Sequence, residues 1–180
     1  VSAMLEVTDL RTHFETPRGV VRAVDGVSFT LDRGKTLGVV GESGSGKTVL
    51  SRSIMGLLPK RGTIREGSVR FDGTELTELS PKQMREFWGA RMSMIFQDPM
   101  TSLNPVMKIG KQITESLRQH LDVDRKYANE LAENLLRSVR IPEPEQRLKE
   151  YPHQLSGGMR QRVCIAVALA CGPALLFADE

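Results

Sequence analysis

The chain has 180 residues, of which 39% are hydrophobic and 26% charged, so it can form a globular domain with its own core. A formal net charge of +3 and an aromatic content of 5% do not predict a surface for nucleic acid. The longest uncharged stretch, residues 163–178, is shorter than the roughly 20 residues needed to cross a bilayer, and a Gly-Pro pair interrupts it.

The beginning of the chain predicts an antiparallel pair of strands. Residues 5–10 alternate apolar and polar side chains, and residues 20–31 do so with interruptions. A loop containing Pro17 and Gly19 joins the two stretches, and residues 32–34 are expected to form a turn.

A glycine-rich segment then lies between an apolar run and a helical pattern. Residues 36–40 predict a buried strand, and residues 49–58 predict a helix. The apolar face of this helix is expected to comprise Leu50, Ile54, Leu57 and Leu58. The segment between them reads GESGSGKT, which is the pattern G-x-x-x-x-G-K-[ST] of phosphate-binding loops in the strand–loop–helix context that such a loop requires.

The glycine-rich segment has the chemistry to bind a nucleoside triphosphate. Its glycines let backbone N–H groups point inward at an anion, and the helix N-terminus adds a partial positive charge. Lys47 brings a full charge to the β- and γ-phosphates, and the Thr48 hydroxyl can ligate Mg²⁺. The nucleotide-binding residues predicted in this loop are Gly41, Ser43, Gly44, Ser45, Gly46, Lys47 and Thr48.

The next part of the chain predicts short elements of an α/β core. Residues 59–67 are expected to form a loop, residues 68–71 a strand, and residues 81–88 a short helix. The pair Asp72 and Gly73 predicts a turn after the strand. Residues 92–96 predict a second buried strand, which ends at Gln97.

A block of helices follows this strand. Apolar residues at intervals of four predict two amphipathic helices. The first carries Ile109, Ile113, Leu117 and Leu121, and the second carries Tyr127, Leu131, Leu135 and Val139. We expect residues from about 103 to 151 to form a helical subdomain inserted between strands of the core.

The last part of the chain predicts a helix followed by a strand. Ser156 is a good N-cap for a helix that begins with Gly157 and Gly158, whose N–H groups and helix dipole suit a second anion contact. A Gly-Pro pair ends this helix, and residues 174–178 predict the last buried strand.

Two carboxylates follow this last strand. Ligands of parallel α/β sheets bind at the carboxyl ends of the strands, and the glycine-rich loop also follows such an end. Asp179 is therefore expected to hold Mg²⁺ opposite Thr48, directly or through water. Glu180 is expected to polarise an attacking water as a general base.

Four segments, in this order and spacing, resemble the ATP-binding cassette ATPases: GESGSGKT, IFQDP, LSGGMRQR and LLFADE. The longer segments IFQDPMTSLNP and YPHQLSGGMRQR are similar, more narrowly, to the ATPase subunits of oligopeptide, dipeptide and nickel importers. The resemblance implies an α/β P-loop NTPase core with a mixed or parallel sheet, an N-terminal antiparallel β-subdomain and the helical insert. Residues 1–180 would form one nucleotide-binding domain, similar to the N-terminal portion of such a subunit.

The resemblance also implies roles for single residues. Phe14 matches the aromatic residue that stacks on adenine. Gln97 matches the glutamine that contacts Mg²⁺ or the attacking water and senses the membrane subunits. Ser156 and Gly158, with Gly157 between them, match the signature that contacts the γ-phosphate of ATP held by the opposite subunit.

The resemblance implies an assembly as well. Two cassettes of this family close head-to-tail around two ATP molecules, and the second cassette can be identical or a paralogue. Their closure drives two membrane permease subunits, with an extracytoplasmic solute-binding protein as an indirect partner. The chain is thus expected to be cytoplasmic and peripheral on the inner face of the membrane, with ATP and Mg²⁺ as ligands and no nucleic acid.

One departure from the family leaves two functions open. The family continues past the catalytic glutamate to a dimer-contact loop and a switch histidine, whereas this chain stops at Glu180. His13, His120 and His153 all lie upstream and do not match that histidine. The first hypothesis is an ATPase subunit that energises import of peptides or a related small solute. The second is a truncated nucleotide-binding module with little hydrolysis of its own.

Other classes of nucleotide-binding protein fit less well. A GTPase or a small-molecule kinase would explain the phosphate loop but not LSGGMRQR. A cassette protein of DNA repair or translation is disfavoured because neither a basic arm nor a coiled coil is visible in the sequence.

The two cysteines and the N-terminal residues indicate the cellular compartment in which we expect the chain. Cys164 and Cys171 are separated by about 10 Å along the predicted helix, which is too far for a disulfide, so we expect buried thiols in a reducing compartment. The N-terminus lacks a cationic start followed by an apolar run, so no signal peptide is predicted. The first residue is not Met, which suggests a processed or excised segment.

Overall fold

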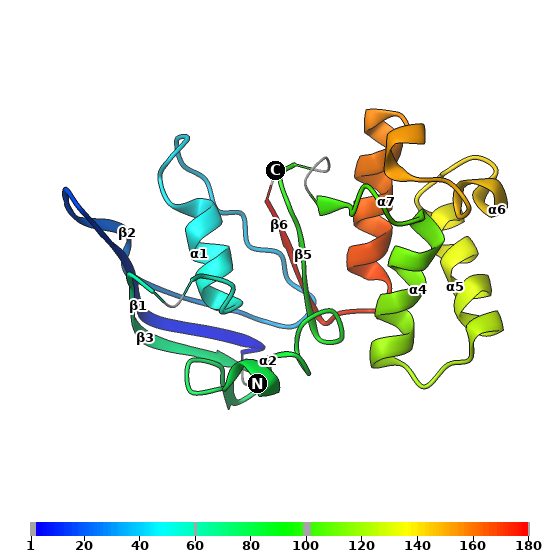
Figure 1. Ribbon diagram of the computed structural model, residues 1–180. Helices are drawn as coiled ribbons and strands as arrows, with labels where there is room; N and C mark the ends of the chain where they lie inside the picture. The colour runs from blue at the N-terminus through cyan, green and yellow to red at the C-terminus, as the bar shows by residue number, and fades with distance from the viewer. Residues whose placement is uncertain (1–2, 60, 99–101, 180) are drawn as a thin grey trace. The chain divides into compact units, whose positions relative to one another are not determined.

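The computed structural model describes residues 3–59, 61–98 and 102–179, and the chain divides into two compact units, Val1–Met84 and Arg85–Glu180. The first unit contains an antiparallel sheet and the second a parallel pair of strands with most of the helices (Figure 1). This composition confirms the predicted α/β class. The bounds of the helical subdomain, about 103–151, stay a prediction.

The first unit is built on a four-stranded antiparallel sheet. Its strand order is β2-β1-β3-β4. The strands are β1 (Leu5–Thr16), β2 (Gly19–Leu31), β3 (Thr63–Phe71) and β4 (Thr74–Glu75). β1 and β2 pair from Leu5 opposite Leu31 to Thr16 opposite Gly19, so the predicted N-terminal hairpin is confirmed and is longer than expected.

Strand β3 is the main correction in this unit. The sequence predicted a loop over residues 59–67, but β3 begins at Thr63 and pairs with β1, for example His13 with Ile64. The reason is tertiary: the long strand β1 offers a row of unpaired backbone groups, and a polar segment can satisfy them. The predicted turn at Asp72 and Gly73 is confirmed, with φ values of 46° and 79°.

A bulge interrupts β1 between Thr8 and Arg11. Asp9 has a φ of 46°, in the left-handed region, and its carbonyl faces Gly67 of β3. A Cβ at Gly67 would lie 2.4 Å from this carbonyl oxygen, so only glycine fits at the crossing.

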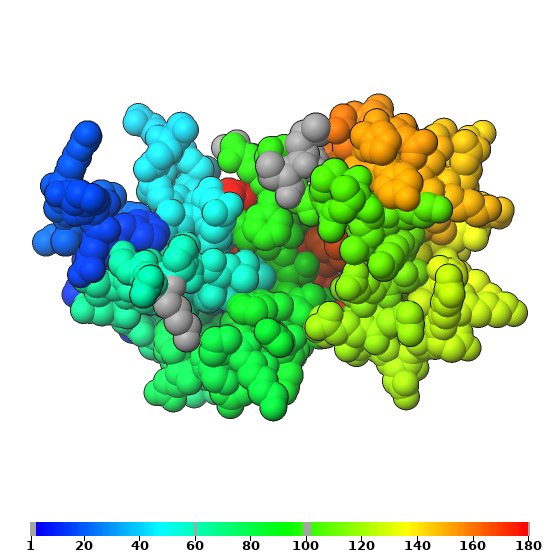
Figure 2. Space-filling model, in the orientation of Figure 1, coloured from blue at the N-terminus to red at the C-terminus, as the bar shows by residue number. Residues whose placement is uncertain are grey.

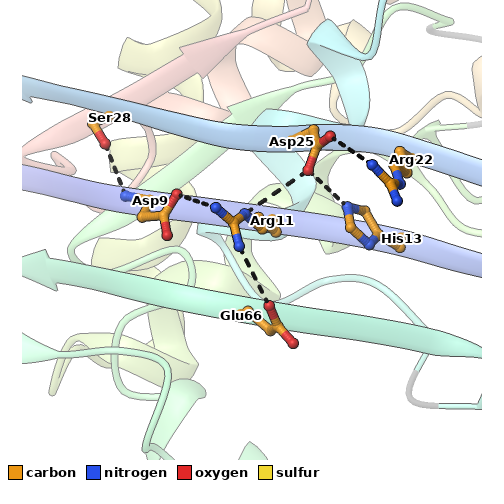
Figure 3. A network of polar contacts seen from close by, with 7 residues as sticks. All are labelled: Asp9, Arg11, His13, Arg22, Asp25, Ser28 and Glu66. Atoms are coloured by element: carbon orange, nitrogen blue, oxygen red, sulfur yellow. Dashed lines mark hydrogen bonds and ion pairs between the residues drawn. The ribbon is translucent and has the colours of Figure 1, made fainter.

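Polar side chains form a network around this bulge (Figure 3). The Arg11 guanidinium lies 3.0 Å from Asp9 and 3.8 Å from Asp25, and His13 Nε2 lies 3.1 Å from Asp25. Ser28 Oγ accepts a hydrogen bond of 2.8 Å from the Asp9 N–H. The network comprises Asp9, Arg11, His13, Arg22, Asp25, Ser28 and Glu66. Exposed ion pairs contribute about 1 kcal/mol or less each, so the network shapes the bulge more than it stabilises the fold.

A half-buried carboxylate joins the edge of the same sheet. Glu75 accepts hydrogen bonds from the hydroxyls of Ser68 and Thr77 and from the backbone N–H groups of Val69 and Thr77. Burial acts to raise the pKa of Glu75, but these hydrogen bonds outweigh it and hold the pKa below its usual value.

Helix α1 (Lys47–Ile54) ends earlier than the sequence predicted. Gly56 has a φ of 66°, its N–H donates to the Ser53 carbonyl, and the Leu57 N–H donates to the Arg52 carbonyl. These two bonds form a Schellman motif, in which a left-handed glycine closes the helix. Leu57 and Leu58 therefore lie outside the helix, and the predicted apolar face is shorter. The predicted helix over residues 81–88 is likewise shorter, as α2 (Pro81–Met84).

The second unit combines a parallel strand pair with a helical core. Strands β5 (Met92–Ile95) and β6 (Leu175–Ala178) pair in parallel, as expected for the two predicted buried strands. The three long helices are α4 (Ile109–His120), α5 (Arg125–Ser138) and α7 (Gly157–Leu169), and they pack side by side (Figure 1). Two short elements, α6 (Pro144–Arg147) and the 3₁₀ helix η1 (Pro152–Gln154), connect α5 with α7.

The helical core confirms one predicted apolar face and corrects the other. Ile109, Ile113 and Leu117 of α4 are buried, while Leu121 follows the helix and is partly exposed. In α5 the fully buried positions are Ala128, Ala132 and Leu136, one residue on from the predicted face, and Tyr127 is 52% exposed. Small alanines let two helices approach closely, so α5 presents Ala128 and Ala132, together with Leu136, to the core.

Gly110 allows the segment that follows α6 to pack closely against the start of α4. The first helical N–H groups of α4, those of Ile109 and Gly110, donate to the carbonyls of Glu150 and Leu148 at 2.9 Å. A Cβ at Gly110 would lie 2.8 Å from the Leu148 oxygen, so the close approach requires glycine. The residues after α6 thus cap the N-terminus of α4 in place of a side chain.

The two cysteines are free in the structure. Cys164 is buried in α7, and burial, together with the charge of Asp98, raises its pKa to about 11. Cys171 is half-buried, and its Sγ lies 3.6 Å from the Ser116 carbonyl oxygen. Among the helices of the described ranges, none combines the length and the apolar character that a bilayer crossing demands.

Candidate functional site

The glycine-rich loop leads directly into α1. Gly44 and Gly46 have φ values of 81° and 93°, in the left-handed region, and Gly46 is the N-cap of the helix. Residues 41–45 are exposed, and cyan atoms of this part of the chain stand at the surface in Figure 2. The loop therefore presents its backbone and the N-terminus of α1 to solvent, as a phosphate-binding loop must.

Gly46 also packs closely against the sheet. A Cβ built on it would lie 2.2 Å from the Ala23 carbonyl oxygen of β2, a distance at which the backbone would have to move. The loop is thus held against β2 at a point that admits no side chain. Gly44 differs, because a Cβ there would meet no described atom within 4 Å.

Lys47 lies across the loop rather than away from it. Its Nζ donates hydrogen bonds to the carbonyl oxygens of Gly41 at 2.7 Å and Glu42 at 2.8 Å. The Ser45 N–H donates to the Glu42 carbonyl at 3.2 Å, which closes the turn. The ammonium group is therefore positioned inside the curl of the loop, where its three donors can reach an anion's oxygens.

The apolar run before the loop does not form the predicted buried strand. No strand pairs with residues 36–40 in the described part of the chain, and Leu37, Val39 and Val40 are 44%, 49% and 94% exposed. The prediction is wrong here because an apolar run becomes a strand only where neighbouring strands supply hydrogen bonds. The sheet of this unit is formed by other segments.

Helix α1 is tied to the sheet by a polar contact. Thr12 of β1 and Ser53 of α1 are both fully buried, and their hydroxyl oxygens lie 2.6 Å apart. A buried hydrogen bond is directional, so this pair fixes α1 on β1 and with it the position of the loop.

Phe14 lies on β1, two residues beyond Thr12, and is half-buried. Alternation along a strand places both side chains on one face of the sheet, the face that α1 covers through Ser53. An aromatic ring on that face, in the unit that carries the loop, is compatible with the predicted adenine contact.

The second unit brings two predicted residues to one edge. Gln97 follows β5 and is exposed, and Asp179 follows β6 and is half-buried. The Asp179 N–H donates to the Ile95 carbonyl at 3.0 Å, so the carboxyl ends of the two parallel strands lie side by side. Glu180 lies outside the described residues, and its predicted role as general base stays a prediction.

Ser156, Gly157 and Gly158 form the exposed N-terminus of α7. Ser156 is the N-cap, and its Oγ accepts a hydrogen bond of 3.3 Å from the Met159 N–H, as predicted. A Cβ at Gly157 or Gly158 would meet no described atom within 4 Å, and neither glycine has a positive φ. Glycine in a helix costs about 0.5–1 kcal/mol relative to alanine, so neither packing nor backbone conformation in the described chain accounts for this pair.

Each unit, taken by itself, carries donors that suit a nucleotide or a metal ion. The loop offers N–H groups, a lysine and left-handed glycines, which is the donor set of a phosphate site. The Thr48 hydroxyl and the Asp179 carboxylate are hard oxygen donors, which suit Mg²⁺. Within the described ranges, no group of three or more His, Cys, Asp or Glu side chains is arranged to hold a metal by itself.

Two contributions to this site were not evident from the sequence. The Ala23 carbonyl fixes Gly46, and the Glu42 carbonyl holds Lys47. Both act through backbone atoms, which any residue would supply, so the sequence pattern carries no signal for them.

Comparisons with known proteins agree with these features. The family model described as ABC transporter matches residues 24–180. The oligopeptide transport ATP-binding protein OppD of Bacillus subtilis is 53% identical over 100% of this chain and 51% of its own length. The dipeptide transport ATP-binding protein DppD of the same organism is 51% identical over 98% of this chain and 53% of its own length. The chain therefore spans about half the length of these curated relatives.

The fold has close counterparts among solved structures. A dimeric post-hydrolysis structure of the ATP-binding cassette MJ0796, bound to ADP and Pi, matches with a TM-score of 0.88 at 23% identity. It covers 98% of this chain and 74% of that chain. The P-loop NTPase fold and the resemblance to importer ATPases are thus confirmed, and this chain belongs to the ABC transporter family.

Proposed function

We propose that the chain binds ATP with Mg²⁺ and forms the nucleotide-binding part of an ATPase subunit that drives peptide import. The observation that carries the proposal is the loop before α1, which is exposed, curled by left-handed glycines and crossed by Lys47. The names of its relatives, which refer to oligopeptide and dipeptide transport, support the substrate class.

In this proposal the first unit holds the nucleotide. The loop from Gly41 to Gly46 surrounds the β- and γ-phosphates with N–H groups, and Lys47 exchanges its two carbonyl contacts for phosphate oxygens. Thr48, in the first turn of α1, is directed at Mg²⁺, and Phe14 stacks on adenine.

The second unit supplies the groups for hydrolysis. Asp179 and Gln97 lie at the carboxyl ends of neighbouring parallel strands and are proposed as metal ligands, with Gln97 also orienting water. Glu180, next to Asp179 in sequence, is the proposed general base. Mg²⁺ supplies charge neutralisation at the phosphates when it is bound.

The open N-terminus of α7 supports a composite site with a second cassette. Gly157 and Gly158 leave room that no described atom fills, and Ser156 presents a hydroxyl beside them. A phosphate held by another cassette can approach such a surface without meeting a Cβ. The solved relative MJ0796 is described as dimeric, which agrees with this arrangement.

The remaining partners follow from the same family. We propose that two cassettes, identical or paralogous, engage two permease subunits at the cytoplasmic face of the membrane. An extracytoplasmic solute-binding protein would act on the permeases and only indirectly on this chain. The names of the curated relatives support the transport role.

One observation favours a second candidate, a nucleotide-binding module with little hydrolysis of its own. Val40 is 94% exposed immediately before the loop, and residues 36–40 belong to no strand of the described chain. A loop whose entry is not anchored by a sheet lacks the preorganisation on which electrostatic catalysis depends.

Calorimetry of MgATP binding tests the shared core of both candidates. Lys47→Ala removes the charge that faces the phosphates and should weaken binding by roughly tenfold or more. Lys35→Ala is the matched control, because Lys35 is exposed and lies outside the loop. Equal affinity of the chain and Lys47→Ala for MgATP would contradict the proposal.

Steady-state hydrolysis separates the two candidates. An ATPase subunit should turn over ATP, and Glu180→Gln should reduce the rate by about 10²–10⁴ while keeping ATP binding, because the amide cannot accept the proton of water. A chain that binds MgATP but turns it over no faster than Glu180→Gln would favour the binding module.

A further inference from the structure

A basic groove lies between α4, α5 and α6 of the second unit, and its lining includes none of the residues proposed for the nucleotide. It has a volume of about 990 Å³. Its cationic lining residues are Lys108, Lys111, Arg118, Arg125, Lys126 and Lys149. Lys111, Thr114 and Arg118 recur at helical spacing along one side of α4, so the cations form a stripe and not a scattered set.

The excess of basic over acidic residues in the chain lies in the lining of the groove. Its lining has six Lys or Arg and three Glu residues. The chain contains 25 Lys or Arg and 22 Asp or Glu, which leaves nineteen of each outside the groove. All of the formal net charge of +3 is therefore concentrated on this one surface.

The cations of the groove are not neutralised by the chain itself. All six side chains belong to exposed residues, and no carboxylate of the described residues lies within 4.0 Å of any of them. Of the acids nearby, Glu133 pairs with Arg137, and Glu143 and Glu150 pair with Arg147. Glu130 and Glu145 also line the groove, but neither lies within 4.0 Å of its cations. Lys108 instead lies 5.9 Å from the centre of the Tyr151 ring.

We infer that this groove docks an acidic polypeptide segment of a protein partner. Like charges gathered along a recess repel one another, and an anionic segment would relieve that repulsion. The stretch of α4 that lines the groove, Gly110 to Arg118, rises about 12 Å, which suits roughly two turns of a helix. At its edge Val106 is 82% exposed and offers one apolar contact.

Two other anionic partners fit the groove less well. A nucleic acid that binds without sequence preference uses aromatic stacking, but Tyr151, the one aromatic residue among the described lining residues, is half-buried and already contacts Lys108. A membrane surface is broad, whereas these cations line a recess between helices. Val106 alone among the described lining residues is a strongly exposed apolar side chain, which is too little for insertion among lipids.

Fluorescence anisotropy with a labelled acidic peptide tests the inference. The probe is a helical peptide of Glu, Leu and Ala, about 15 residues long, near the length at which isolated helices become stable. We expect it to bind the chain at low ionic strength and to be released by salt. The double substitution Lys111→Glu with Arg118→Glu should weaken binding roughly tenfold or more, because two attractions become repulsions.

Further variants test whether the loss of peptide binding comes from the charges of the groove itself. Lys82→Glu with Arg70→Glu reverses two exposed charges outside the groove and should leave peptide affinity within about twofold, as the local origin of the attraction requires. If circular dichroism shows that the α4 double variant is unfolded, Lys126→Glu with Lys149→Glu tests the opposite side of the groove. MgATP binding, measured in parallel, should be unchanged in both groove variants.

The outcomes that overturn the inference are equally specific. Peptide affinity that is unaffected by either groove variant would place the binding elsewhere. Tighter binding of phosphatidylglycerol vesicles or of single-stranded DNA than of the peptide, lost in the same variants, would assign the groove to a lipid surface or a nucleic acid.

Discussion

Replacing Gly46 by alanine should disrupt the phosphate loop by two separable effects. The residue has a φ of 93°, and the left-handed region costs a residue with a Cβ about 1–2 kcal/mol. The new Cβ would also lie 2.2 Å from the Ala23 oxygen, closer than real Cβ atoms approach, so the loop must leave β2. We expect a total loss above about 2 kcal/mol in the free energy of unfolding.

Gly44→Ala is the matched control for this substitution. Gly44 has a φ of 81°, but a Cβ there meets no described atom within 4 Å. It should therefore lose only the conformational term of about 1–2 kcal/mol. The difference between the two variants isolates the collision with Ala23.

Urea denaturation, followed by circular dichroism, measures both free energies of unfolding. Equal slopes against urea would show that the variants differ in stability and not in the surface exposed on unfolding. MgATP affinity should fall further in Gly46→Ala, because its loop has moved. If both variants lose the same free energy, the contact between Gly46 and β2 does not position the loop.

Three further predictions follow from the packing and the pKa values. Gly158→Ala should leave stability unchanged or raise it by up to about 1 kcal/mol, yet reduce ATP turnover of the assembled ATPase; a loss of stability would contradict the open surface at α7. Burial raises the pKa of Cys164 to about 11, so the neutral thiol contributes its full stability below about pH 9 and loses it as the pH rises toward 11. Between pH 9 and pH 11 the free energy of unfolding of Cys164→Ala should therefore fall less than that of the unsubstituted chain, as melts at alkaline pH would measure. Glu75→Gln should lower the free energy of unfolding by about 1 kcal/mol at pH 7. The difference from the unsubstituted chain should shrink below pH 4, because the pKa of Glu75 is lowered in the folded chain and its stabilising contribution is lost as the carboxylate is protonated. A difference that persists at low pH would refute this origin.

Elements with strong local signals could be predicted from the sequence. Ser156 followed by two glycines marks the start of α7 because capping depends on neighbouring residues alone. The hairpin of β1 and β2 was predicted for the same reason, since alternation and the turn at Gly19 are local. Gly56 carried a local signal too, the stop of α1, but Leu57 and Leu58 continued the apolar pattern and concealed it.

The features that could not be predicted depend on distant segments. Residues 63–67 are mostly polar and form part of β3 only because β1 lies beside them. Conversely, residues 36–40 are apolar, but no described strand pairs with them. The buried face of α5 is formed by Ala128 and Ala132, which the sequence does not distinguish from surface alanines until α4 and α7 are in place.

The capping of α4 determines how selective its groove can be. The Ile109 and Gly110 N–H groups are already occupied by the carbonyls of Glu150 and Leu148. Recognition there is left to long lysine and arginine side chains, whereas the loop before α1 presents backbone N–H donors. The phosphate loop would discriminate by the geometry of its ligand, and the groove by the sign of its charge, so many unrelated acidic sequences could be accepted there and the choice among them would rest with the partner.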